Sequence, residues 1–242
     1  QIGCSLSCNF CATGFLPRKR NLKAWEIYDQ VFLLNQLSEK ELGQGLTNIV
    51  YMGMGEPLMN YDEVVQSLKI LNDEKEGLGI GARRITVSTS GIARNIVRLA
   101  DEGLKINLAL SLHASNNDTR NQIMDINRSN PLETIIPALK HFYDKTKNKI
   151  SYEYILLSGI NDSEKDAIDL ASLCRDFPVY VNIIEYNPVD NVSYYKSKKN
   201  HRDVFLDTLR RQGISSKIRK SRGKDIDAAC GQLANKIMKI GI

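Results

Sequence analysis

Histidine and tryptophan are scarce in this chain of 242 residues, which contains three of the first and one of the second. Long apolar runs are missing, since none approaches the roughly 20 residues that a membrane-spanning helix needs. The chain also lacks low-complexity tracts, linkers rich in proline or glycine, and a basic segment followed by an apolar one at its start. These absences favour a cytoplasmic protein with no membrane partner and with one domain over residues 1–242.

The chain does not begin with methionine but with Gln1, three residues before a cysteine. We therefore expect it to be a fragment whose natural N-terminus is missing. A short strand leading into the cysteine-rich segment would be part of what is missing.

Cysteine is present in an odd number, five, and three of the five lie within eight residues of one another. A secreted disulfide scaffold would distribute an even number over a shorter chain. The clustered cysteines are Cys4, Cys8 and Cys11, and the other two are Cys174 and Cys230. This distribution indicates a metal centre in a reducing compartment.

Apolar, β-branched runs alternate with segments of helical spacing along the whole chain. The runs that predict strands are 48–53, 84–90, 107–113, 151–157, 180–186 and 216–221. The segments that predict helices are 24–42, 61–72, 92–101, 132–146, 164–175 and 202–212. Side chains at Asn60 and at Asp162 or Ser163 are expected to cap two of these helices. The run 48–52 is continuously apolar, which predicts a strand covered on both faces.

Such an alternation predicts parallel strands joined by right-handed crossovers. Six units fit an α/β fold of the partial (β/α)6 TIM-like barrel type better than a closed barrel of eight units. A doubly wound open sheet is the alternative. In either architecture the functional groups lie at the carboxyl ends of the strands.

The first cysteines have the spacing C-x3-C-x2-C, with Phe10 just before Cys11. Thiolates are the ligands of iron–sulfur clusters, and three of them leave one iron of a [4Fe-4S] cluster open to chelate a substrate. A closed zinc site needs a fourth ligand. His113, His141 and His201 are distant in sequence, although that does not exclude them in space. The spacing therefore favours a cluster over zinc.

Small and polar residues follow several predicted strands. Gly53 and Gly55 would let the backbone approach a ligand closely, and Glu56 could receive a ligand ammonium group. The segments 88–91, 111–113 and 187–188 carry hydroxyl, imidazole and amide groups that suit ribose and carboxylate recognition. Taken alone, such residues more often cap the following helices.

Cys230 lies between Ala229 and Gly231 in a stretch that contains Asp and Lys, which is typical of an accessible loop. Cys174 instead follows a helical apolar pattern, and we assign it to packing.

The whole chain resembles the RlmN-type dual-specificity RNA methyltransferases of the radical S-adenosylmethionine (SAM) superfamily, with Cfr-type enzymes as relatives. The resemblance depends on motifs that occur in family order: QIGC at 1–4, MGMGEP at 52–57, STSG at 88–91, SLHA at 111–114, YNP at 186–188 and DIDAACGQL at 225–233.

The resemblance implies two cofactors, a [4Fe-4S] cluster and S-adenosyl-L-methionine. It implies that Cys4, Cys8 and Cys11 ligate the cluster and that Cys230 carries a methyl group. The residues implied to bind SAM are Gly55, Glu56, Ser88, Ser111, Leu112, His113 and Asn187.

The implied reaction begins with methylation of the Cys230 sulfur by one SAM. A second SAM is cleaved to a 5′-deoxyadenosyl radical, which takes hydrogen from the S-methyl group. The resulting methylene radical adds to C2 of an adenine, which is not nucleophilic enough for ordinary methyl transfer. The implied targets are adenosine 2503 of 23S rRNA and adenosine 37 of tRNA.

The family pattern also contains a second cysteine, which resolves the covalent adduct, an N-terminal accessory RNA-binding domain and a proton-accepting glutamate. All three would precede Gln1, and Cys174 does not match the missing cysteine. We further expect a monomer and an electron donor such as flavodoxin. The alternatives that stay open are a Cfr-type methyltransferase acting on C8 and a non-catalytic, metal-containing RNA-binding module.

The net charge of +5 permits a nucleic-acid partner without requiring one. Three basic stretches could contact phosphate: 18–20, 196–202 and 219–224. Tyr194 and Tyr195 lie beside the second stretch and could stack on a base. Each stretch alone is more often a solvated surface.

Overall fold

The computed structural model describes residues 1–189 and 192–219. Six strands alternate with helices: β1 (Ile49–Tyr51), β2 (Ile85–Thr89), β3 (Asn107–Ser111), β4 (Ile150–Leu156), β5 (Val179–Glu185) and β6 (Ser216–Arg219). The α-helices are α1 (Ala24–Leu42), α2 (Tyr61–Asn72), α3 (Ala93–Asp101), α4 (Asn117–Ile123), α5 (Leu132–Thr146), α6 (Glu164–Leu173) and α7 (Lys199–Arg211). Short 3-10 helices are η1 (Ala12–Phe15), η2 (Pro57–Asn60), η3 (Ala82–Arg84) and η4 (Asp125–Arg128).

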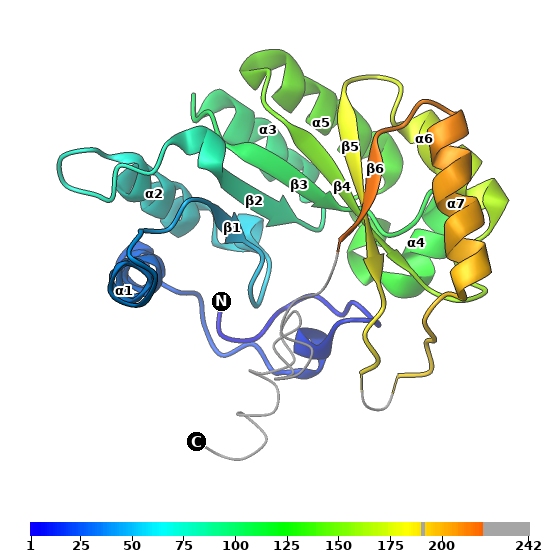
Figure 1. The fold of residues 1–242 in the computed structure, drawn as a ribbon, viewed down its shortest axis with the longest axis horizontal. Helices are drawn as coiled ribbons and strands as arrows, with labels where there is room; N and C mark the ends of the chain where they lie inside the picture. The colour runs from blue at the N-terminus through cyan, green and yellow to red at the C-terminus, as the bar shows by residue number, and fades with distance from the viewer. Residues whose placement is uncertain (190–191, 220–242) are drawn as a thin grey trace.

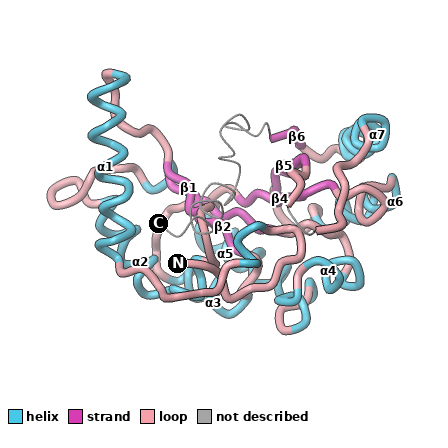
Figure 2. The backbone as a smooth tube through the Cα atoms, turned by 90° about the horizontal axis from the view of Figure 1, so that it is seen from below, coloured by secondary structure: helices cyan, strands magenta, loops and turns pink. Residues whose placement is uncertain are grey.

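All six strands are parallel and lie in the order β1-β2-β3-β4-β5-β6. The sheet curves without closing, and the helices lie on its outer side (Figure 2). Its two edge strands approach each other on the inside, where Arg219 Nη1 of β6 lies 3.2 Å from the sulfur of Met52, just after β1. The predicted partial (β/α)6 barrel is therefore confirmed.

The main core fills the space between the sheet and its covering helices. Leu108 and Leu110 of β3 are fully buried, as are Ile135, Leu139 and Phe142 on one face of α5. Spacings of three and four residues place these α5 side chains on one stripe of the helix, which packs on the sheet. Burial of such apolar surface is the main source of stability.

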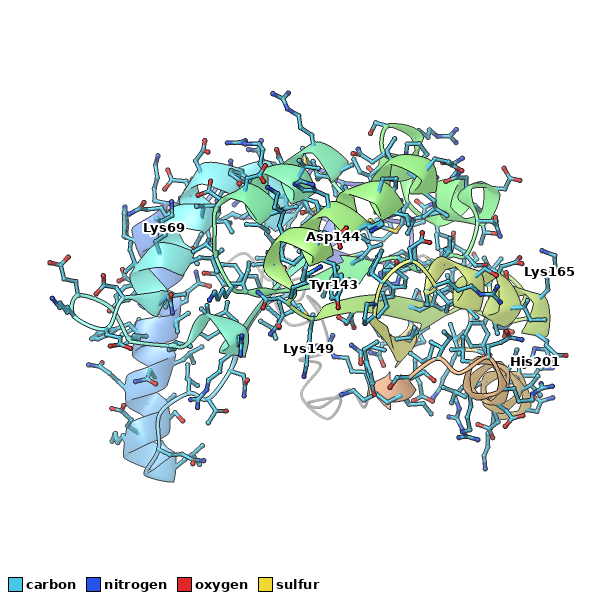
Figure 3. The ribbon with its side chains drawn as sticks, turned by 90° about the horizontal axis from the view of Figure 1, so that it is seen from above. Lys69, Tyr143, Asp144, Lys149, Lys165 and His201 are labelled. Carbon is cyan, nitrogen blue, oxygen red and sulfur yellow. The ribbon has the colours of Figure 1, made fainter. Side chains whose placement is uncertain are left out.

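Charged residues on the outer faces of α2 and α6 form ion pairs. Lys69 of α2 pairs with Glu102, and Lys165 of α6 pairs with Asp169. Figure 3 shows these two lysines, together with His201 of α7, at the periphery of the molecule. Exposed pairs of this kind contribute little to stability, so the stability of the fold comes mainly from its core.

Two local expectations are wrong, and one helix was not predicted. Val50 of β1 is 54% exposed, so this edge strand is not covered on both faces. The Asn60 side chain does not cap α2, because its Nδ2 donates to the carbonyl of Leu22 instead. The helix α4 was not expected, since its seven polar-rich residues show no apolar stripe. The cap of α6 is confirmed, with Ser163 Oγ accepting from the Asp166 amide.

The N-terminal segment crosses the carboxyl ends of the strands (Figure 1). Its backbone is attached there at Cys8, which forms an antiparallel bridge with Met124, and at Asn9, whose amide donates to the Ile123 carbonyl over 3.0 Å. The terminal amino group of Gln1 donates to the Met54 carbonyl after β1. The segment with the three clustered cysteines therefore faces the end of the sheet where a barrel of this type carries its functional groups.

Candidate functional site

A cavity opens at the carboxyl ends of the strands, beneath the N-terminal segment. Nine of the eleven residues singled out from the sequence line it: Cys4, Cys8, Cys11, Gly55, Glu56, Ser88, Ser111, His113 and Asn187. Leu112 does not line the cavity, because its side chain is fully buried in the core. Cys230 lies outside the described residues.

Tight turns place the three thiols around one side of the cavity. The Cys11 amide donates to the Cys8 carbonyl, and the Leu6 amide donates to the Cys4 sulfur over 3.3 Å. Gly3 adopts φ +78°, and a Cβ atom there would lie 2.3 Å from the Pro17 carbonyl oxygen. Only glycine fits such a close approach in the left-handed region. The backbone before and within this loop therefore fixes where the sulfurs lie.

Two of the three thiols, Cys4 and Cys8, lie in an environment that opposes their ionisation. Burial, and then the neighbouring Cys11 and Cys4, raise the pKa of the Cys8 thiol to about 12. Burial likewise raises the pKa of Cys4. Thiols with raised pKa values make poor free nucleophiles. Since a metal ion deprotonates the thiols that bind it, Cys4 and Cys8 suit ligation better than covalent catalysis.

Within residues 1–189 and 192–219, no three His, Cys, Asp or Glu side chains converge on a point where one metal ion could be held. In an iron–sulfur cube each thiolate binds a different iron, so three sulfurs spread around one cavity fit a cluster. The donor set is also all thiolate, as such clusters prefer.

Glu56 is 3% exposed, and both of its oxygens accept hydrogen bonds from the protein. Oε1 accepts from the Leu58 amide over 2.9 Å, and Oε2 accepts from the Ser90 amide and hydroxyl over 2.7 and 2.8 Å. Burial raises the pKa of this carboxyl, although the amide and hydroxyl donors act in the opposite direction. Glu56 therefore links the loop after β1 to the end of β2 as well as lining the cavity.

Gly55 adopts φ +90°, and a Cβ atom there would lie 2.4 Å from the Gln1 side-chain oxygen. That oxygen accepts from the Glu56 amide over 2.9 Å. The glycine therefore allows the loop after β1 to pass close to the start of the N-terminal segment.

Polar side chains from neighbouring strands form a row inside the barrel. The hydroxyls of Ser88 and Ser111 lie 3.5 Å apart, and Ser111 is the register partner of Glu153 on β4. Glu153 is itself paired with Asn182 of β5, whose amide donates to its carboxylate over 2.6 Å. Arg219 Nη1 lies 3.4 Å from the other oxygen of Glu153.

Glu153 lines the cavity but was not predicted from the sequence, and Arg219, which was expected to contact phosphate, lines the cavity as well. A signal for the first existed, because a carboxylate interrupts the apolar run from 152 to 157. A buried charge is costly unless it is paired and hydrogen-bonded, so an acidic residue within a central strand indicates an interior that is polar or functional.

His113 is almost completely buried and has φ +59°. Its Nδ1 accepts from the Ile155 amide over 3.1 Å, and its ring meets Phe10 edge-on with the centroids 4.8 Å apart. Burial, and then the charge of Arg120, lower the pKa of His113 to about 3. The ring is therefore neutral at physiological pH, and since Nδ1 is an acceptor, its proton is on Nε2.

Several residues of the basic stretches pair with acidic neighbours. Arg20 binds Glu26 through both terminal nitrogens at 2.6 Å, and Lys196 and Arg202 pair with Glu185. Residues 220–224 lie outside the described residues. Tyr195 is 72% exposed, so of the two tyrosines it is the one with a surface available to a base.

A loop of three thiols set over the carboxyl ends of an open parallel barrel defines a class, the radical SAM proteins. The sequence profile of the Radical SAM superfamily matches residues 1–171 of the chain.

More closely related proteins narrow the class. The chain is 48% identical to the "Probable dual-specificity RNA methyltransferase RlmN" of Flavobacterium psychrophilum, over 98% of the chain and 68% of that protein. It superposes on the crystal structure of a radical SAM methyltransferase from Sphaerobacter thermophilus with a TM-score of 0.92 and 43% identity, over 96% of this chain and 67% of that one. The chain therefore belongs to the RlmN family of radical SAM RNA methyltransferases.

A more distant neighbour shares the fold alone. It is Streptococcus suis SuiB bound to S-adenosylmethionine, with a TM-score of 0.67 and 16% identity, over 91% of this chain and 49% of that one. The chain spans about two thirds of the length of the curated relatives that it matches.

Membership of this family confirms the two expected cofactors, a [4Fe-4S] cluster and SAM. Among the residues that the structure describes, no helix is long and apolar enough to cross a membrane.

Proposed function

We propose that this protein methylates C2 of an adenosine in RNA, with adenosine 2503 of 23S rRNA and adenosine 37 of tRNA as its targets. The similarity to proteins named as dual-specificity RNA methyltransferases supports an RNA substrate. The reaction type, radical rather than polar methyl transfer, matches the poor nucleophilicity of an adenine C2.

One observation carries the proposal: residues predicted from five separate segments line a single cavity. In that cavity Cys4, Cys8 and Cys11 hold the cluster. Gly55, Glu56, Ser88, Ser111, Leu112, His113 and Asn187 form the SAM site, with Leu112 acting through its backbone.

When bound, the cluster supplies the electron that cleaves SAM. The chain positions and shields the ligand. Glu56, held by three donors, offers a fixed negative charge near the position of a ligand ammonium group. The Ser88 and Ser111 hydroxyls suit ribose oxygens, and the Nε2–H group of neutral His113 is available as a donor.

Cys230 is proposed as the methyl carrier. RNA contacts are assigned to the basic stretches and to Tyr195, whose exposed ring would stack on an unpaired base. The target adenine has to leave its stack to enter the cavity. The protein acts as a cytoplasmic monomer and receives electrons from a donor such as flavodoxin.

The test is an anaerobic assay with the reconstituted protein, a reductant, SAM, and RNA fragments that contain either target adenosine. Nucleosides from the digested RNA are separated and identified by mass spectrometry against 2-methyl- and 8-methyladenosine standards. We expect 2-methyladenosine from wild type and none from Cys8→Ala.

8-Methyladenosine would instead support the Cfr-type alternative and overturn the C2 proposal. RNA binding without SAM cleavage would support a non-catalytic binding module. Cys174→Ser is the matched control, because it removes a thiol that lies away from the cavity. This variant should still form the product.

A further inference from the structure

A guanidinium group is completely buried behind the proposed SAM site. Arg120 of α4 has 0% exposure, and among the described residues it forms no ion pair with a carboxylate. Its side chain donates only to neutral acceptors: the carbonyls of Leu112, Ser90, Ser111 and Asn130, and the side-chain oxygen of Asn127. An arginine with this many partners is well hydrogen-bonded, but its charge is not compensated by them.

These partners belong to the strand ends that form the site. Ser111 ends β3 and carries one of the two paired hydroxyls, while Leu112 follows it. Ser90 follows β2, and its amide and hydroxyl both donate to Glu56. Through one planar fork, Arg120 therefore fixes the ends of two strands relative to each other.

The helix that carries Arg120 also supports the cysteine loop. The carbonyl of Ile123, at the end of α4, accepts from the Asn9 amide over 3.0 Å, and the Gln122 carbonyl accepts from the Asn9 side chain over 2.8 Å. Met124, the next residue, bridges to Cys8. Arg120 and the loop between Cys8 and Cys11 are thus parts of one connected unit.

A buried cation without an anionic partner is unfavourable by itself. Two of the residues whose carbonyls accept from Arg120, Ser90 and Ser111, line the same cavity as the three thiols. The guanidinium charge therefore lies directly behind the wall of the cavity in which Cys4, Cys8 and Cys11 would hold a cluster.

We propose that Arg120 is a positioning residue that joins the cysteine loop to the SAM-binding strand ends, and that its buried charge favours reduction of the bound cluster. This inference rests on the proposed assignment of Cys4, Cys8 and Cys11 as ligands. A positive charge within a low-dielectric interior stabilises the more negative state of a neighbouring group. Removal of that charge therefore makes the cluster harder to reduce.

The test is a redox titration of the reconstituted holoprotein, without SAM, monitored by electron paramagnetic resonance. For Arg120→Gln we expect the equilibrium constant for reduction to fall about tenfold, which for one electron is a shift of about 59 mV to more negative potential. Arg120→Lys retains the positive charge but lacks the planar guanidinium group and its several donors. It should keep a potential near that of wild type while amide hydrogen exchange across residues 4–11 becomes faster.

A second variant neutralises the charge of Arg120 without replacing the arginine. Asn127 accepts from Arg120 Nη1 over 2.6 Å and is 1% exposed, so Asn127→Asp places a carboxylate against the guanidinium. Its potential should shift in the same direction as that of Arg120→Gln. Arg128→Gln, an exposed arginine on η4, is the matched control and should change neither potential nor exchange.

Unchanged potentials in both Arg120→Gln and Asn127→Asp, with wild-type iron content, would overturn the inference. Failure of every variant to fold would also overturn it, since Arg120 would then serve stability alone. A wild-type protein that binds no cluster would instead refute the proposed ligands, and iron and sulfide analysis separates that result from the others.

Discussion

Lowering the pH should destabilise the protein, and the buried imidazole of His113 should account for a defined part of that loss. Burial lowers the pKa of this ring from 6.5 to about 3, so the folded state stays unprotonated where the unfolded state takes up a proton. The stabilising contribution is therefore complete above the unfolded pKa and is lost as the pH falls through the window from about 6.5 towards about 3. Each pH unit within that window is worth roughly 1.4 kcal/mol.

Between about pH 7 and pH 4.5 the loss attributable to His113 is roughly 2.5 kcal/mol of unfolding free energy. The suitable replacement is His113→Asn, because asparagine tolerates φ +59° and its Oδ1 can accept from the Ile155 amide in place of Nδ1. Asparagine does not titrate, so the variant should lack this part of the pH dependence.

The assay is urea unfolding of the cluster-free protein at a series of pH values, followed by circular dichroism. Other groups titrate as well, and the informative quantity is the difference between the wild-type and His113→Asn profiles. His141→Asn, on the outer side of α5, controls for the loss of a surface histidine. Parallel profiles for wild type and His113→Asn would refute the argument that burial keeps this ring neutral.

Three further predictions concern the ligands, the loop after β1 and the proposed carrier. Replacement of Cys4, Cys8 or Cys11 by alanine should abolish the cluster, measured as iron, sulfide and visible absorbance after anaerobic reconstitution; a triple variant that retained about four irons would contradict the assignment. Glu56→Ala should lower the unfolding free energy by about 3 kcal/mol, because three buried donors lose their acceptor, and should weaken SAM binding in calorimetry. A folded variant with wild-type SAM affinity would exclude a ligand role. Peptide mass spectrometry should find an extra methyl group on Cys230 of protein expressed with intact iron–sulfur assembly, and an unmodified Cys230 in Cys4→Ala; methylation without the cluster would contradict a shared SAM site.

The sequence alone was sufficient for the architecture and for nine of the residues that line the cavity. Apolar runs separated by helical segments predict parallel strands even when it is not known which strands pair. Burial of both faces of a parallel sheet requires a continuous apolar run along each strand. The C-x3-C-x2-C spacing is equally local, since a loop that presents three thiolates to one cluster needs all of them within a few residues.

Sequence reasoning failed where the decisive interaction is between segments distant along the chain. Val50 belongs to an apolar run but lies exposed in an edge strand, and whether a strand is at an edge depends on the order of the sheet. Glu153 is hydrogen-bonded to Asn182 and paired with Arg219, which lie on the next two strands. Parallel strands bring such residues together only after long crossovers.

The sequence by itself determined the class of protein, the candidate ligands and the succession of strands and helices, because periodicity and close spacing are properties of short stretches of chain. Only the tertiary structure decided the burial, the charge state and the contacts of those residues. Burial makes His113 neutral. Hydrogen bonds give Glu56 a linking role and hold the buried Arg120 against the strand ends of the site. Desolvation and Coulomb interactions depend on what surrounds a group in space, and no local pattern of residues contains that information.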